Sequence, residues 1–425
     1  MKQINIPRLG EQYFEHQLSN GLLLRVIPKR GFAKKYAFLA VDFGSIDTNF
    51  TLEGKSYCMP AGIAHYLEHK MFDLPEDNAM NLFAANTGVP NAFTGYSITA
   101  YYFSCTANFE ENLRILLRMV LTPYFTEESV EKERGIIAQE IKMYEDSAES
   151  RVYEGMFDSA FAHHPIRIPI AGSVESIGQI TSQMLYDCHH AFYQPANMVL
   201  CIVGDVDEEG VCRLVEELTP DDARPLPERD YGEEETMQCK NRRFEKTMSV
   251  SMPTFAIGFK SEKIGVGEEL MRAEIVGDLA AEILCGESSE LYSKLYESGL
   301  IDADFSAGFE NVKGACLLSA NGDSRDPEAV YQAILQEAER LVREGFDLSQ
   351  FERLRKSALG RRTRDLDSFE SISYRNCAYH FDGMDYFRFP EVYASVTPEA
   401  VHEFLSCVVR DERGVLAVIR PKEEM

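Results

Sequence analysis

Runs of apolar residues predict β-strands near the start of the chain. Residues 22–27 and 36–43 are β-rich, and Ser19-Asn20-Gly21 in front of them is a turn signal. We therefore expect antiparallel strands within residues 13–45.

Helical patterns and two further strand-like runs fill the rest of the first half. The run at 91–105 is rich in β-branched and aromatic side chains, which favour a strand. The expected strands are residues 91–105 and 197–203, and the expected helices are residues 61–74, 78–85, 126–146, 149–161, 182–193 and a segment around 113–120.

Residues 219–241 have the composition of a linker. They contain Pro220, Pro225 and Pro227 and a cluster of acids around 232–235. We therefore expect an N-terminal domain at 1–218, an acidic linker at 219–241 and a C-terminal domain at 242–425.

The order of elements repeats after the linker. Glu352 follows Glu133 by 219 positions (352 − 133), and a strand-like run at Gly414 follows one at Met198 by 216 (414 − 198). Nearly constant offsets indicate a duplicated unit of roughly 200 residues. The expected fold class is α+β, with two homologous units that each pack an antiparallel-rich sheet with helices.

Composition narrows the class of protein. The chain has 425 residues, a net charge of −26 and ten scattered cysteines without a C-x-x-C spacing. The charge argues against nucleic acids and anionic membranes as partners. The cysteine pattern favours reduced thiols, and no run approaches the ~20 apolar residues of a spanning helix. The first residues lack the apolar run of a signal peptide, so we expect a cytoplasmic protein without a membrane partner.

Two histidines lie four residues apart in His65-Tyr66-Leu67-Glu68-His69. Residues i and i+4 share a helix face, so His65 and His69 could bind one metal ion. Imidazole nitrogens suit zinc, and the nearby Glu68 carboxylate could act as general base on a bound water. The order His-x-x-Glu-His is that of inverted zincins. The alternative is a pair of ordinary histidines on an amphipathic helix.

The segment 131–145 offers a third ligand. Glu133 and Glu140 are seven residues apart (140 − 133), so they share a helix face. Glu140 lies at the edge of an apolar stripe, which makes it the better ligand, with Glu133 as an auxiliary carboxylate. The stripe expected to face the core consists of Ile136, Ile137 and Ile141. A solvated acidic face is the alternative.

The second repeat is an internal control. It has no histidine in the matching helix at 268–284, and Leu359 stands where the first repeat has Glu140. The histidines and the glutamate are therefore absent together, which favours chemistry over packing as their role in the first repeat.

Nearly the whole chain resembles the pitrilysin/insulysin superfamily of inverted-zincin metallopeptidases. The most specific segments are Gly62 to His69, Asn91 to Thr94, Glu133 to Tyr144 and Gly204-Asp205-Val206. Within the superfamily the chain is most similar to bacterial two-domain processing peptidases, described as zinc proteases or as factors associated with the modification of elongation factor P.

The resemblance implies one Zn²⁺ per chain, held by His65, His69 and Glu140. Glu68 would be the general base, and Glu133 an auxiliary catalytic carboxylate.

The resemblance also implies a substrate-binding edge strand at Asn91, Ala92 and Phe93. An edge strand offers unpaired N–H and C=O groups, so a peptide can add to it as an extra strand largely independently of its sequence. The alternative for Asn91 is a loop cap.

One feature of the family is missing. An arginine and a tyrosine that hold the substrate carbonyl are expected in the second repeat, but the stretch from Leu295 to Asp302 lacks both at the expected positions. We therefore expect a homodimer, or a heterodimer with a homologous, catalytically inactive chain, in which the two repeats of this chain form half of a clamshell.

These observations predict a zinc-dependent endopeptidase that hydrolyses peptides or unfolded segments. The alternative is a maturation or assembly factor without peptidase activity, whose zinc site is structural or vestigial and which acts with a homologous partner. A plain substrate-binding module is a third option.

Overall fold

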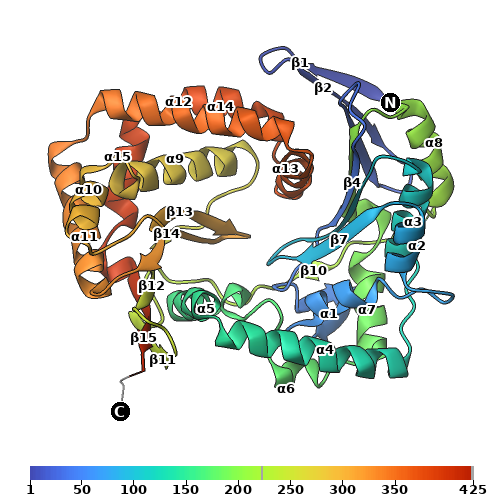
Figure 1. Ribbon diagram of the computed structural model, residues 1–425, viewed down its shortest axis with the longest axis horizontal. Helices are drawn as coiled ribbons and strands as arrows, with labels where there is room; N and C mark the ends of the chain where they lie inside the picture. The colour runs from blue at the N-terminus through green and yellow to red at the C-terminus, as the bar shows by residue number, and fades with distance from the viewer. Residues whose placement is uncertain (222–223, 423–425) are drawn as a thin grey trace. The chain divides into compact units, whose positions relative to one another are not determined.

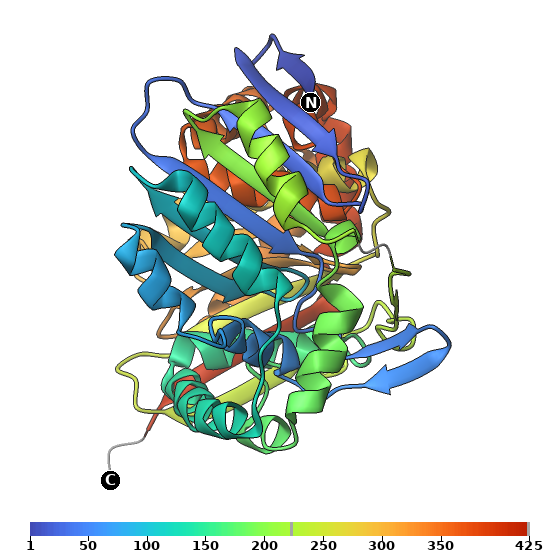
Figure 2. The same ribbon diagram turned by 90° about the vertical axis from the view of Figure 1, so that its right-hand side faces the viewer.

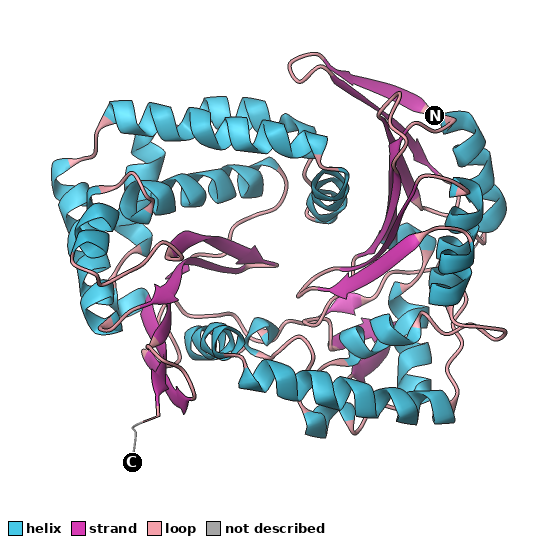
Figure 3. Ribbon diagram, in the orientation of Figure 1, coloured by secondary structure: helices cyan, strands magenta, loops and turns pink. Residues whose placement is uncertain are grey.

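The computed structural model describes residues 1–221 and 224–422. Its helices and strands form two packed units, each with its own sheet (Figure 1; Figure 3). Unit 1 contains residues 1–141, 169–231 and 363–381, and unit 2 contains residues 142–168, 232–362 and 382 onward. Residues 222–223 of the expected linker and 423–425 of the expected second domain lie outside the described residues.

Unit 1 is built on a seven-stranded sheet in the order β1-β2-β3-β9-β4-β8-β7 (Figure 2). β3 and β9 pair in parallel, and the other neighbours are antiparallel. β3, β4 and β9 are buried along nearly their whole length, as expected of strands covered on both faces. The strands are β1 (Lys2–Ile6), β2 (Glu11–Gln17), β3 (Leu23–Pro28), β4 (Lys35–Val41), β7 (Val89–Thr94), β8 (Thr99–Cys105) and β9 (Met198–Gly204).

The expectation of one strand at 91–105 is wrong. Gly95 N–H donates to Ile98 O at 2.7 Å and closes a turn, so the run folds into the hairpin of β7 and β8. β7 thereby becomes the last strand of the sheet, paired on one side only. The antiparallel pairing expected within 13–45 holds for β2 and β3, whereas β9 lies between β3 and β4.

A small sheet of β5 (Asn49–Leu52), β6 (Lys55–Cys58) and β10 (Glu228–Arg229) also belongs to unit 1. β10 comes from the expected linker. Arg229 forms ion pairs with Asp42 and Asp47 at 3.0 and 3.1 Å. Part of residues 219–241 is therefore bound to unit 1 by a sheet and by charges.

The helices of unit 1 cover its sheet and supply the core. α3 buries Leu113, Leu116, Leu117 and Val120 against the sheet, as the apolar pattern predicts. The helices are α1 (Ile63–Lys70), α2 (Ala79–Ala85), α3 (Phe109–Leu121), α4 (Glu127–Asp146, which continues into unit 2), α6 (Val174–Ile177), α7 (Ser182–Phe192), α8 (Glu208–Leu218) and α13 (Phe369–Phe381), with 3₁₀ turns at Pro195–Asn197 and Asp365–Asp367.

Unit 2 repeats the sheet of unit 1. Its order, β11-β15-β12-β14-β13, corresponds to β3-β9-β4-β8-β7, and β11 and β15 are the parallel pair, as β3 and β9 are. The strands are β11 (Arg243–Met248), β12 (Thr254–Ser261), β13 (Ser306–Val312), β14 (Ala315–Asp323) and β15 (Gly414–Pro421). The expected α+β fold of two homologous units is confirmed.

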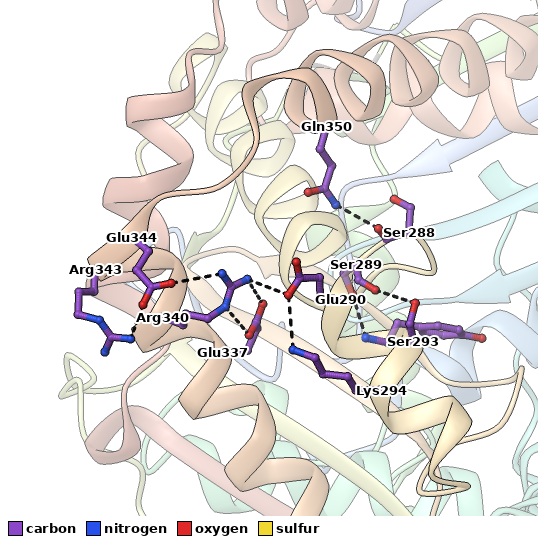
Figure 4. A network of polar contacts seen from close by, with 11 residues as sticks. Ser288, Ser289, Glu290, Ser293, Lys294, Glu337, Arg340, Arg343, Glu344 and Gln350 are labelled. Atoms are coloured by element: carbon purple, nitrogen blue, oxygen red, sulfur yellow. Dashed lines mark hydrogen bonds and ion pairs between the residues drawn. The ribbon is translucent and has the colours of Figure 1, made fainter.

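Charged pairs link the helices of unit 2. Arg340 of α11 contacts Glu337 and Glu344 of the same helix and Glu290 of α10, as Figure 4 shows. The helices are α5 (Ala148–Ala160), α9 (Glu268–Cys285), α10 (Glu290–Glu297), α11 (Pro327–Glu344), α12 (Leu348–Arg364), α14 (Phe389–Ser395) and α15 (Pro398–Val408), with 3₁₀ turns at Pro165–Arg167, Tyr386–Arg388 and Asp411–Arg413.

The two repeats exchange one helix. α5, from the first half of the sequence, packs on β11, β12 and β15, whereas α13, from the second half, packs on β4 and β9. α13 begins 221 residues after α5 (369 − 148), so these are equivalent helices of the duplication. The boundaries 1–218 and 242–425 therefore describe the halves of the sequence, whereas the packed units are interleaved.

All ten cysteines are free thiols, and seven of them are buried. Within the described residues, no helix is both long enough and apolar enough to cross a membrane.

The packing of α13 predicts a large effect on stability. Ile372 of α13 is fully buried. Ile372→Ala should lower the free energy of unfolding by about 2–5 kcal/mol, since it removes buried methyl groups and leaves a cavity. Urea unfolding measures the change. Ile136→Ala, at a side chain that is 49% exposed, is the matched control and should cost much less. Equal costs would contradict the burial of α13 on the sheet of unit 1.

Candidate metal centre

The first helix of the site, α1, is held in one position by its surroundings. Gly62 starts it with a φ of +88°, and a Cβ there would lie 2.4 Å from the carbonyl oxygen of Ala171. Ile63, Ala64 and Leu67 are buried in the core. Only glycine fits this start without strain, so the turn and the core together fix the direction of α1.

The second helix, α4, faces α1 through its buried side. Val130, Ile137 and Ile141 are buried, whereas Ile136 is half exposed, so the expected stripe is wrong at Ile136. Tyr66 of α1 donates to the carbonyl oxygen of Val130.

The ammonium group of Lys70 adds a second link between the helices, donating to the carbonyl oxygen of Ser129 at 3.2 Å. These two bonds set α4 against α1 at the level of the histidines.

His65, His69 and Glu140 converge. Their ligand atoms lie within 4.8 Å of one another. His65 Nε2 is 3.6 Å from one oxygen of Glu140, and His69 Nε2 is 3.4 Å from the other. These separations exceed ordinary N–H···O hydrogen bonds, and they match the spacing of about 3.4 Å between neighbouring ligands of a tetrahedral zinc ion.

The donor set therefore fits zinc, which two imidazoles and one carboxylate can hold with a position left open. His65 Nδ1 is buried and has no hydrogen-bond partner among the described residues, which leaves Nε2 as the atom directed at Glu140.

Glu133 orients His69. Its carboxylate oxygen lies 2.9 Å from His69 Nδ1, so the other ring nitrogen faces Glu140. Burial lowers the pKa of His69, but the hydrogen bond to Glu133 and the nearby carboxylates of Glu140 and Glu68 outweigh burial and raise this pKa to about 10. The bond to His69 in turn lowers the pKa of Glu133. A carboxylate behind a metal-binding histidine is the usual arrangement in zinc sites.

Glu68 is buried beside the same group. Burial raises the pKa of its carboxyl, against the opposing charges of His65 and His69 and a hydrogen bond from Thr94. Thr94 Oγ1 donates that bond at 2.9 Å. The sequence did not reveal this role of Thr94, although Thr94 ends the Asn91 to Thr94 segment.

The predicted substrate-binding residues Asn91, Ala92 and Phe93 lie in β7, so Asn91 is in a strand and not in a loop cap. The Asn91 side chain accepts a hydrogen bond from Ala92 N–H at 2.9 Å. Ala92 packs against the core, and Phe93 points to the opposite face of the sheet.

On that face Phe93 contacts Tyr374 of α13, with ring centroids 6.0 Å apart. Tyr374 is 41% exposed. The contact joins residues 281 positions apart (374 − 93), so no local pattern could have predicted it.

Two family models match most of the chain. The family model described as Insulinase (Peptidase family M16) matches residues 38–174, and the model described as Peptidase M16 inactive domain matches residues 179–358. The uncharacterized zinc protease YmfH of Bacillus subtilis (strain 168) is 37% identical to this chain over 432 residues. The match covers 99% of this chain and 100% of the YmfH chain.

This chain belongs to peptidase family M16. A crystal structure of a putative M16-like peptidase from Alicyclobacillus acidocaldarius is 31% identical, has a TM-score of 0.94 and covers 99% of this chain and 100% of that chain. A protease from Helicobacter pylori shares the fold, with a TM-score of 0.83, 18% identity and coverage of 97% and 100%. The resemblance to the pitrilysin superfamily is confirmed, and the candidate metal centre lies within the segment that matches the first family model.

The contact between Glu133 and His69 predicts an effect on metal affinity. Glu133→Gln should weaken zinc binding about 10–100-fold, because the amide no longer orients His69 or increases its basicity. Competition with a chelator measures the affinity. Glu131→Gln is the control, since Glu131 lies on the same helix and pairs with Arg134. Equal affinity in both variants would contradict the role of Glu133.

Proposed function

We propose that this M16 member is a zinc-dependent endopeptidase acting on peptides or unfolded segments. One observation carries the proposal: His65, His69 and Glu140 converge with zinc-ligand spacing, and the buried Glu68 lies beside them. Structural zinc sites are normally closed by four protein ligands, whereas three ligands leave one position open for a water that a neighbouring carboxylate such as Glu68 can deprotonate.

Each side chain of the site has its own role in cleaving the scissile peptide bond. A zinc ion held by the three ligands would polarise the scissile carbonyl and lower the pKa of an attacking water. Glu68 takes a proton from that water and passes it to the amine that leaves when the C–N bond breaks. Thr94 keeps the Glu68 carboxylate in place during the transfer. Glu133 fixes the orientation of His69.

β7 supports an extended substrate. It is the last strand of its sheet, and its final residue, Thr94, contacts Glu68. A peptide that adds to its free edge is bound mainly through backbone hydrogen bonds, at a strand that leads directly to the general base. Such binding requires an extended chain, which is why peptides and unfolded segments are the proposed substrates.

The rival function is a maturation or assembly factor with a vestigial site. The family model for residues 179–358 is described as an inactive domain, and a structure with that description shares the fold, with a TM-score of 0.79 and 14% identity. That segment begins after the last candidate ligand, Glu140, and the candidate metal centre lies within residues 38–174, which match the other family model.

Replacing Glu68 tests the proposal. Glu68→Gln keeps the size and most contacts of the side chain but cannot accept the proton, so cleavage should fall at least about 10²-fold at unchanged zinc content. A library of unstructured peptides of about 20 residues, analysed by mass spectrometry, measures cleavage. Glu131→Gln is the control, and it should yield the same cleavage products as the wild type. Equal cleavage by wild type and Glu68→Gln would exclude the proposed mechanism.

We infer further that a second chain completes the enzyme, either another copy or a homologous inactive chain. The stretch from Leu295 to Asp302 lacks the arginine and tyrosine expected to hold the substrate carbonyl, and such stabilisation is often a large part of catalysis.

Sedimentation velocity and activity, measured on the same sample, test this inference. We expect either a dimer with activity or a monomer whose peptide cleavage rises when a homologous chain is added. A sharp monomer with full activity would contradict the need for a partner.

A further inference from the structure

A second group of side chains that could hold a metal ion lies near the other edge of the unit 1 sheet. His16 of β2 faces Cys212 and Glu216 of α8, and the three ligand atoms lie within 4.8 Å of one another. Figure 1 shows α8 beside the end of the sheet that carries β1 and β2. The residues come from elements about 200 positions apart, so only the fold brings them together.

The fold presents all three side chains to the same point. Phe14 and His16 are two residues apart on β2, so His16 shares the face on which Phe14 packs against the core. Cys212 and Glu216 are four residues apart (216 − 212), so they lie one above the other on α8. His16 Nε2 is 3.0 Å from Glu216 Oε1, and Cys212 Sγ is 3.9 Å from the same oxygen.

The three side chains differ in how far they are exposed to solvent. Cys212 is 6% exposed, whereas the side chains of His16 and Glu216 are 34% and 50% exposed. A metal ion could therefore enter from solvent and keep a water at an open position. The thiol would lie at the inner end, where it is shielded from exchange.

Glu216 is the carboxylate that faces Cys212 and His16 directly. Glu209, on the same helix, is already paired with the amino group of Met1 at 3.4 Å. A divalent cation would offset the charge of Glu216 and stabilise the Cys212 thiolate.

We propose that His16, Cys212 and Glu216 bind a second zinc ion, in addition to the one expected at His65, His69 and Glu140. The set of one imidazole, one thiolate and one carboxylate suits zinc, with water as the fourth ligand. On binding, the Cys212 thiol releases its proton to solvent and its sulfur donates an electron pair to the metal.

This second site is independent of the candidate catalytic site. β2 and β7 are the second and seventh strands of the sheet, five spacings or about 24 Å apart. The ion would link the sheet to α8 and so join residues 196 positions apart (212 − 16). Its role is to stabilise the edge of unit 1 that β1 and β2 form, because a ligand that binds only the folded state shifts the folding equilibrium.

Cobalt spectroscopy separates the two sites. Co²⁺ bound to a thiolate gives an intense near-ultraviolet charge-transfer band, whereas histidine and carboxylate ligands alone do not. The intact chain, stripped of metal and titrated with Co²⁺ under reducing conditions, should develop the band. Cys212→Ser should abolish it, and His16→Ala should weaken cobalt binding at least tenfold. Cys58→Ser, at an exposed cysteine outside the group, should leave it unchanged.

Metal counting gives an independent answer. Wild type should hold two zinc ions per chain, and Cys212→Ser and Glu140→Gln one each, with the cobalt band retained in Glu140→Gln. A band that survives Cys212→Ser, or that is lost equally in Cys58→Ser, would overturn the second site. A single zinc ion in wild type that disappears in Glu140→Gln would overturn it as well, without affecting the proposed peptidase function.

Discussion

The grouping of three carboxylates between two helices, one of them buried, is the constraint that shapes the candidate site of unit 1. Glu68, Glu133 and Glu140 lie beside only two histidines, and buried charges are costly unless they are paired or coordinate a metal. Glu133 is paired with His69. Glu140 faces both imidazoles at a spacing that suits a divalent cation, so a metal ion would supply the positive charge that this group of carboxylates lacks.

The rest of unit 1 keeps these groups together. Gly62 starts α1, and Ile137 and Ile141 hold α4 against the core. Thr94 links Glu68 to the end of an edge strand. Each contact positions one element of the site on a rigid helix or strand, which is the arrangement that catalysis by fixed groups requires. The same contact places Glu68, the proposed general base, next to β7, the strand proposed to bind an extended peptide.

Comparing the two repeats shows which features belong to the shared fold and which occur only in the first repeat. The two sheets share one strand order, and the equivalent helices α5 and α13 pack on each other's sheets. The second repeat keeps this architecture without the ligands, so the fold does not need them. The exchange of helices has a further effect, since α13 brings Tyr374 from the second half of the chain to Phe93 of the edge strand.

The sequence by itself determined the features that depend on local spacing. His65 and His69, Glu133 and Glu140, and the amphipathic α3 follow from helical periodicity, and the duplication follows from constant offsets. Local pattern misplaced Ile136 in the core and predicted one strand where Gly95 and Ile98 close a hairpin. Only the tertiary structure decided that β9 lies between β3 and β4, that Thr94 bonds to Glu68, and that His16 meets Cys212 and Glu216. These contacts join residues that are far apart in the chain, and packing of whole elements brings them together, so they leave no periodic signal in the sequence.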